Sequence, residues 1–330
     1  MVKIMNKKKW CSLLLGTIML FAVPLLAHGE TKSDNYSVSP IFSENQTTNV
    51  TSFYDIKWSP GKTEKVGVRI TNNSDEDREY TLTTNKAQTN KNGIIDYSST
   101  QKEETKGHRI TEMVRFPPVV KVLAHTSQDI YTEFTFPQAD FNGILMGGIH
   151  ISEKKQQNSS QGVTNVIAYN IPLVIRGNIE QRPDAKIKFG TISFEKETVN
   201  HYALAMKLTN VETNFLKNVS VKVKIKNEKE KVVDEQESTV DITPETTFSY
   251  PIHLKSAYKS GKYHVEIALK HDKQVWKKSK TIVLSNDQAK QLKQSSKSKK
   301  IAGFPVIMGL LLFFVLFVIG FILLKIKKKK

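Results

Sequence analysis

Hydrophobic and polar residues alternate along most of the chain between residues 60 and 285. The clearest stretches are 65–70, 130–136, 220–226 and 262–269, where nearly every second residue is Val, Ile, Leu, Tyr or Phe. A period of two places alternate side chains on opposite faces of a strand, one face buried and the other in contact with water. Turn-forming clusters such as 90–93 separate these stretches, and no long amphipathic helical pattern lies between them. The pattern predicts an all-β protein.

The chain begins with the layout of a secretory signal peptide. Lysines at positions 7–9 precede an apolar run over residues 10–26, and small residues follow at 27 and 29. This arrangement predicts export, with cleavage after Gly29 and loss of residues 1–29. An uncleaved N-terminal membrane anchor is the alternative.

A second apolar run, residues 303–324, lies near the C-terminus and contains no charged residue. Its 22 residues would form a helix of about 33 Å, enough to cross a hydrocarbon core of about 30 Å. Residues 325–330 add five lysines and form a basic tail that we expect to remain in the cytoplasm. The chain is therefore predicted to be a single-pass protein of the cell membrane, with residues 30–302 extracellular and associated with the cell wall.

The exported part is long enough for two domains and contains no cysteine. The only cysteine, Cys11, lies in the predicted signal peptide, so stability outside must come from apolar burial and sheet hydrogen bonds. A turn-rich interruption around 177–184 places a domain boundary between residues 182 and 183. We expect two tandem immunoglobulin-like β-sandwich domains and one C-terminal transmembrane helix. The predicted extracellular segments are a first sandwich over 30–182, a second over 183–285 and a Lys/Ser-rich stalk over 286–302.

Charge is distributed unevenly between the two predicted domains. Residues 30–182 hold 17 basic and 18 acidic residues (net −1), whereas residues 183–285 hold 18 basic and 13 acidic residues (net +5). Export excludes nucleic acid as a partner. Many lysines of the second domain alternate with Val and Ile. The favoured interpretation is that these lysines lie on the solvent-exposed faces of strands, where they also discourage edge-to-edge pairing of sheets. Binding of an anionic polymer is the alternative.

The sequence contains no motif typical of an enzyme. Its eight histidines show no H-E-x-x-H spacing, and neither a G-x-S-x-G elbow nor a phosphate-binding glycine loop is present. We therefore expect no catalytic residue, no metal ion and no cofactor.

Three aromatic residues of the first domain are candidates for stacking on sugar rings: Tyr54, Trp58 and Tyr97. Aromatic side chains usually dominate the cores of β-sandwiches, so core packing is the favoured role for each, and stacking is the alternative.

A second candidate lies in the segment 140–151, where a strand pattern is broken by paired glycines. It contains Asn142, Gly147 and Gly148. Glycine weakens the interior of a strand, so a local reason is expected, either a β-bulge or the close approach of another backbone. A β-bulge is the favoured interpretation, and an edge that docks a partner strand or a glycan is the alternative.

Several short segments stand in a recognisable order along the chain. They are 36–41, 44–46, 53–56, 60–61, 71–74, 90–97, 141–143, 147–149, 261–263 and 276–277. Together with the C-terminal apolar run and basic tail, this order resembles the WxL-interacting protein family of Gram-positive bacteria. The cysteine-free exported part is also typical of such bacteria.

The resemblance implies a binding protein rather than an enzyme. It implies a first domain that binds peptidoglycan, a second domain that binds host molecules such as extracellular matrix, and partners that are surface proteins with WxL domains. It implies no catalytic or ligand residue that could be assigned. Two other functions remain open: an adhesin that binds host matrix or polyanions through the basic second domain, and an assembly factor that lends a β edge to secreted wall proteins.

Overall fold

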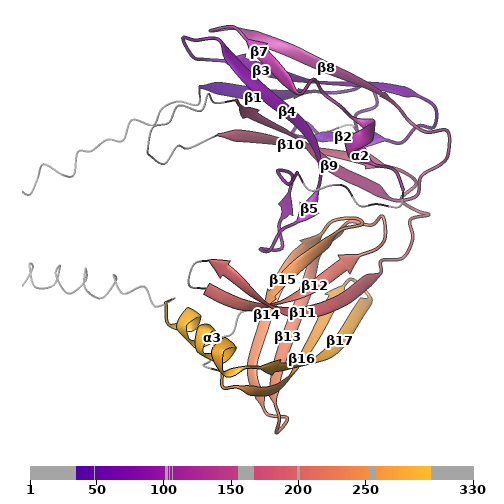
Figure 1. The fold of residues 1–330 in the computed structure, drawn as a ribbon. Helices are drawn as coiled ribbons and strands as arrows, with labels where there is room; N and C mark the ends of the chain where they lie inside the picture. The colour runs from indigo at the N-terminus through magenta and orange to yellow at the C-terminus, as the bar shows by residue number, and fades with distance from the viewer. Residues whose placement is uncertain are drawn as a thin grey trace, which may run out of the picture.

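The computed structural model describes residues 35–298, except 48, 101–102, 104, 106, 155–166, 199–200 and 253–257. It consists of two β-sandwiches stacked along the chain, with a small hairpin between them (Figure 1). The prediction of an all-β protein is confirmed. The predicted signal peptide (1–29) and membrane helix (303–324) lie outside the described residues. Within the described part, no helix is both long and apolar enough to traverse a bilayer.

The first sandwich has a three-stranded and a five-stranded sheet. The three-stranded sheet has the order β1 (Tyr36–Ile41), β3 (Thr63–Asn72), β8 (Ser127–Thr135). The five-stranded sheet has the order β2 (Tyr54–Lys57), β10 (Ala168–Arg176), β9 (Ile144–Glu153), β4 (Arg78–Lys86), β7 (Val119–Val122). Strands β2 and β10 are parallel, and a single helical turn, α2 (Ile110–Met113), lies beside the second sheet.

The second sandwich has a three-stranded and a four-stranded sheet. The first has the order β11 (Ile187–Thr198), β12 (His201–Asn210), β15 (Thr247–Ile252). The second has the order β14 (Val232–Ile242), β13 (Leu216–Asn227), β16 (Gly261–His271), β17 (Gln274–Leu284). The predicted boundary between residues 182 and 183 falls in the connection from β10 to β11.

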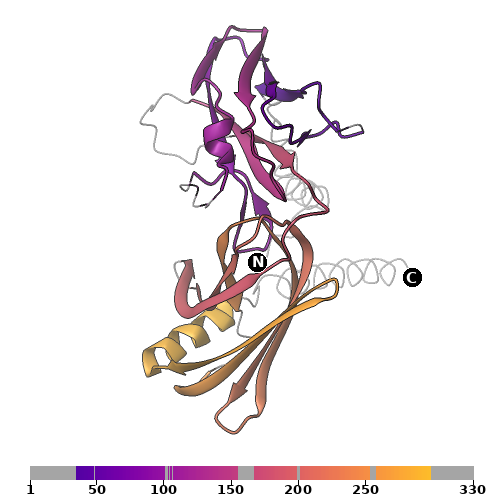
Figure 2. The same ribbon diagram turned by 90° about the vertical axis from the view of Figure 1, so that its right-hand side faces the viewer.

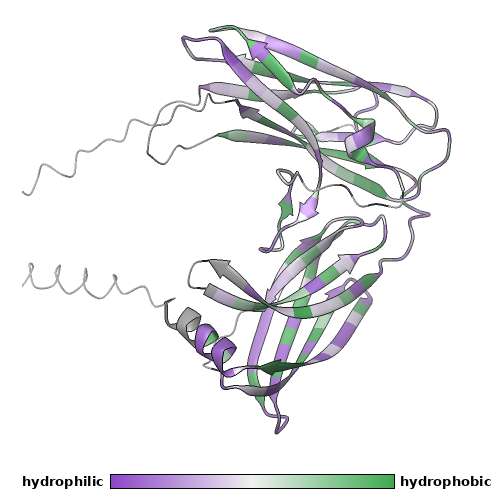
Figure 3. Ribbon diagram, viewed as in Figure 1, coloured by the Kyte–Doolittle hydropathy of each residue, from purple (hydrophilic) through white to green (hydrophobic). Residues whose placement is uncertain are grey.

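Each sandwich has its own core, formed by the inward residues of the alternating pattern. In the first, Val68 and Ile70 of β3 face Ile149 and Leu173 of the other sheet. Hydrophobic residues therefore appear at intervals along each strand and are separated by polar ones (Figure 3). This follows from the two-residue period, because only every second side chain reaches the space between the sheets.

The segment predicted to be a stalk contains a helix, α3 (Asn286–Ser298), which lies beside β12 at one side of the second sandwich (Figure 2). Ser285 caps it reciprocally: Gln288 N donates to Ser285 Oγ (3.2 Å), and Ser285 N donates to Gln288 Oε1 (3.0 Å). Ala289 and Leu292 are buried, and Leu292 belongs to the second core. Residues 286–298 of the predicted stalk thus form a helix, and its two buried apolar residues lie one helical turn apart among polar ones.

Candidate functional site

Tyr54 and Trp58 lie in the core of the first sandwich. The Tyr54 side chain is fully buried and its hydroxyl donates to the Gly67 carbonyl; burial raises the pKa of this phenol. Trp58 packs against Phe136, with ring centroids 4.9 Å apart, and its Nε1 donates to the Ala139 carbonyl at 3.1 Å. The structure thus places both residues where they pack the interior and away from the surface.

Gly147 and Gly148 lie on β9, a central strand. They pair with Leu173 and Pro172 of β10 on one side and with Lys86 and Asn85 of β4 on the other, without a shift in register. The paired glycines therefore lie neither at a bulge nor at a free edge, which contradicts the favoured bulge and the docking edge, but a neighbouring backbone does approach Gly147 closely, as also expected. Close packing explains them instead.

Neighbouring groups leave no room for a side chain at either glycine. A Cβ on Gly147 would lie 2.6 Å from the Asn85 carbonyl oxygen and 3.0 Å from a methyl group of Ile110. A Cβ on Gly148 would lie 2.7 Å from the Cβ of Tyr97. The glycines allow α2 and the residues after β6 to approach the sheet.

Tyr97 and Asn142 contribute to an interdomain joint, which we define as residues 85–97 and 142–144 of the first domain with 211–215 and 240–246 of the second. Tyr97 is half-buried in an apolar cluster that also contains Met146 and Val174, and Phe215 of the second domain packs on the same cluster. The Asn142 carbonyl accepts a hydrogen bond from Thr213 Oγ1 (2.8 Å). Ile144 N donates to the Thr213 carbonyl (2.8 Å).

A short hairpin, β5 (Gln88–Thr89) and β6 (Ile95–Asp96), supplies the polar half of the joint. Thr89 Oγ1 donates to the Asp241 carbonyl (2.8 Å) and accepts from Thr243 N (3.0 Å). Asp241 N donates to the Gly93 carbonyl (2.8 Å). The two sandwiches are therefore joined by main-chain and side-chain hydrogen bonds around an apolar centre.

A buried lysine completes the joint. The Lys86 ammonium donates to the Glu245 carbonyl at 3.0 Å. Burial lowers the pKa of Lys86, and the nearby carboxylates of Glu103 and Glu245 oppose this effect. The hydrogen bond from Lys86 to the Glu245 carbonyl ties β4 to the second domain.

The outward surface of the β1–β3–β8 sheet carries an exposed aromatic ring. We call the outward residues of β3 and β8 the tyrosine face; their cross-strand pairs are Thr63–Thr135, Lys65–Glu133, Gly67–Tyr131, Arg69–Asp129 and Thr71–Ser127. Tyr131 is 44% exposed and lies across the strand from Gly67. The Lys65 ammonium lies 4.6 Å from the centroid of its ring.

Ion pairing orders the rest of the tyrosine face. Arg69 donates to both carboxylate oxygens of Asp129, at 2.6 and 2.8 Å. This pairing, assisted by Tyr131, holds the pKa of Asp129 below its usual range.

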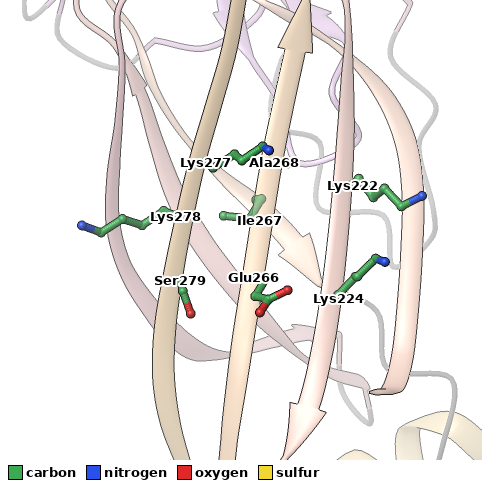
Figure 4. A pocket seen from close by; sticks show the side chains of 8 residues that line it. All are labelled: Lys222, Lys224, Glu266, Ile267, Ala268, Lys277, Lys278 and Ser279. Carbon is green, nitrogen blue, oxygen red and sulfur yellow. The ribbon is translucent and has the colours of Figure 1, made fainter. Parts of the chain in front are cut away.

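A shallow groove of about 420 Å³ lies on the outward face of the four-stranded sheet of the second domain (Figure 4). We call it the lysine groove; its lining residues are Lys222, Lys224, Glu266, Ile267, Ala268, Lys277, Lys278 and Ser279. Ala268 lies between Lys222 and Lys277 in the strand register, and its small side chain leaves the groove open.

The lysines of the groove differ in their partners. Lys222 binds Glu235 at 3.1 Å, which raises the pKa of Lys222 and lowers that of Glu235. None of the ion pairs found in the described part of the chain includes Lys277 or Lys278. Figure 4 shows Lys277 reaching over β16 toward Ala268, whereas Lys278 points the other way. Lys277 is therefore the cation best placed to meet an anionic group in the groove.

Across the described ranges, no three His, Cys, Asp or Glu side chains are grouped so that they could hold a metal ion.

Tyr131 is not among the candidate residues predicted from the sequence. The signal was present, because the alternation in 130–136 places Ile130 and Phe134 inside and therefore Tyr131 outside.

Comparison with protein families confirms the resemblance noted in the sequence. A family model described as WxL Interacting Protein, peptidoglycan binding domain, matches residues 36–153, and one described as WxL Interacting Protein, host binding domain, matches residues 158–294. The second match begins before β10, although β10 pairs with β9 and β2 of the first sandwich. A search of curated proteins finds no match.

The solved structures that match the chain include fimbrial chaperones. The complex of a chaperone and a tip adhesin of CFA/I fimbriae is 14% identical, with 76% of this chain and 99% of that chain covered and a TM-score of 0.31. The CsuC–CsuE complex of Acinetobacter baumannii is 10% identical, with 75% of this chain and 97% of that chain covered and a TM-score of 0.35. The chaperone DraB of E. coli is 14% identical, with 76% of this chain and 97% of that chain covered and a TM-score of 0.28.

Proposed function

Because the chain belongs to the WxL-interacting protein family, we propose that it holds WxL-domain proteins, peptidoglycan or both at the wall of a Gram-positive bacterium, without catalysing a reaction. The observation that carries this proposal is the order of two family domains along one chain, one named for peptidoglycan binding (36–153) and one for host binding (158–294). The signal peptide and membrane helix predicted from the sequence would place both domains outside the cell and retain them there.

The interdomain joint supports a holding role. A protein that links wall and partner transmits force between its domains, and hydrogen bonds such as that from Thr213 Oγ1 to the Asn142 carbonyl resist their separation. Since each sandwich closes its own core, the linkage needs no disulfide.

Capture from intact cells tests this proposal. The tagged full-length chain is produced in a Gram-positive host, cross-linked and purified, and the bound proteins and glycans are identified. We expect a WxL-domain protein or peptidoglycan fragments at levels well above those for an unrelated tagged membrane protein. Recovery of neither above that control would contradict the proposal.

The lysine groove favours a second candidate function, adhesion to an anionic matrix polymer. Exposed charges are screened over about 8 Å in physiological salt, so attachment through Lys277 and its neighbours should weaken steeply as salt is added. We expect the Lys277→Glu variant to elute from a heparin column at distinctly lower salt than the unaltered protein. Lys121→Glu, on the first domain, is the matched control and should elute later than Lys277→Glu. Elution of the two variants at the same salt concentration would rule out the lysine groove as the site that binds the anionic polymer.

A further inference from the structure

We propose that the tyrosine face is a glycan-binding surface, on which the ring of Tyr131 stacks against a sugar ring of the peptidoglycan chain. This inference rests on the proposed function, since it assumes that the first domain contacts the wall. It assigns the contact to a residue and to a chemical mode, namely stacking of an aromatic ring on the apolar face of a pyranose.

The exposure of Tyr131 is the first argument. Eight large apolar or aromatic side chains are exposed in the described part of the chain, and Tyr131 is the only aromatic one among them: Ile94, Val119, Leu123, Tyr131, Ile167, Val232, Val275 and Val283. A tyrosine has an apolar body and a polar tip, which suits a surface that is partly wet and partly covered by a ligand.

The second argument is that the ring is held in place before any ligand arrives. It lies against Gly67 so closely that a Cβ there would come within 2.7 Å of the ring. Lys65 approaches the ring from β3, and Tyr131 also interacts with Asp129, which Arg69 binds. A ring that is already ordered loses little conformational entropy when it binds.

The charge of the tyrosine face selects the kind of ligand. Lys65 lies 3.8 Å from Glu133, and Arg69 lies 2.6 Å from Asp129, so two cations and two anions neutralise each other in cross-strand pairs. Such a face offers no net charge to a polyanion. The groups left for recognition are the ring and the hydroxyl pairs at the two ends, Thr63–Thr135 and Thr71–Ser127, each with 2.8 Å between the oxygens.

These groups match a neutral glycan. A pyranose presents C–H groups on its faces and hydroxyl or amide groups at its rim, which complement a central aromatic ring flanked by hydroxyls. The face extends from residue 63 to 71 on β3, about 27 Å at the usual rise per residue, which is long enough for an extended chain of sugars. An aromatic ring could also serve only to cover Gly67 in the sheet, and the test separates these roles.

The test is co-sedimentation of the purified full-length protein with peptidoglycan that has been stripped of proteins and anionic polymers. We expect Tyr131→Ala to bind about tenfold more weakly than the unaltered protein, which corresponds to the loss of one aromatic contact. Tyr131→Phe, which keeps the ring, should stay within about twofold. So should Val119→Ala, the matched control, because Val119 is similarly exposed (41%) but lies on β7 in the other sheet of the first domain. Unchanged thermal unfolding of the variants shows that the fold is intact.

The outcomes separate this inference from the proposed function. If the unaltered protein and Tyr131→Ala bind peptidoglycan equally, the inference is overturned and wall binding stands. If the unaltered protein does not bind, wall binding and the inference both fail. A readout that needs no variant is the NMR signal of the Tyr131 ring on addition of tetra-N-acetylchitotetraose. We expect it to shift, and an unchanged signal would overturn the inference.

Discussion

The Gly147→Val variant is expected to lose the native packing of the first domain. Its Cβ would lie 2.6 Å from the Asn85 carbonyl oxygen, a main-chain atom on the neighbouring strand, and its methyl groups would meet Ile110. Strand β9 cannot shift to relieve the clash because β10 and β4 bind it on both sides. Overpacking of this kind costs up to about 3 kcal/mol in free energy of unfolding, a large part of the stability of one domain.

Urea denaturation, followed by tryptophan fluorescence, measures this loss. Trp58 is buried in the first core, so its emission reports the packing of the affected domain. Gly107→Val is the matched control: apart from its own residue and its two chain neighbours, no atom lies within 4 Å of the position of its Cβ. Its stability should stay within about 0.5 kcal/mol of the unaltered protein. Equal stability of Gly147→Val and the control would show that close packing does not account for the paired glycines.

The Thr89→Val variant is expected to loosen the interdomain joint while both cores remain folded. Valine has nearly the shape of threonine but removes the oxygen that accepts from Thr243 N and donates to the Asp241 carbonyl. Both Thr89 and Thr243 are buried, so the amide of Thr243 would lose its partner in a site that excludes water. An unsatisfied buried N–H costs about 1–3 kcal/mol.

Amide hydrogen exchange at Thr243 measures this opening. A loss of about 2 kcal/mol would speed exchange roughly thirtyfold, whereas amides in the centre of each core should keep their protection. Thr247→Val is the control, because its hydroxyl bonds to Thr209 on the exposed side of β15 and β12 and does not belong to the joint. Unchanged exchange at Thr243 would mean that Thr89 does not hold the domains together.

The alternation of residues predicted the strands well because it follows directly from burial. Val66, Val68 and Ile70 on β3, or Val221, Val223 and Ile225 on β13, have to face a core, and their spacing leaves a strand as the only geometry. The sequence pattern did not predict helix α3, because the buried face of this helix in the described residues consists only of Ala289 and Leu292.

The candidate site was harder to predict than the fold. The spacing of Tyr54, Trp58 and Tyr97 does not reveal which aromatic rings face inward, because that depends on which strands they pair with. Gly148 is required by Tyr97, which lies 51 residues earlier in the chain, and a single sequence does not display such long-range contacts. Conversely, the exposure of Tyr131 can be predicted from its near neighbours alone, because buried and exposed residues alternate along β8 and Ile130 beside it is buried.

The proposal that the first domain binds peptidoglycan is central to this account of the chain. Equilibrium binding of the purified full-length protein to purified peptidoglycan tests it most directly, with the bound fraction measured over a range of glycan concentrations and at two salt concentrations. We predict saturable binding that changes little with salt, because the tyrosine face carries no net charge. A protein that stays in the supernatant while folded, or that binds only at low salt, would contradict the account.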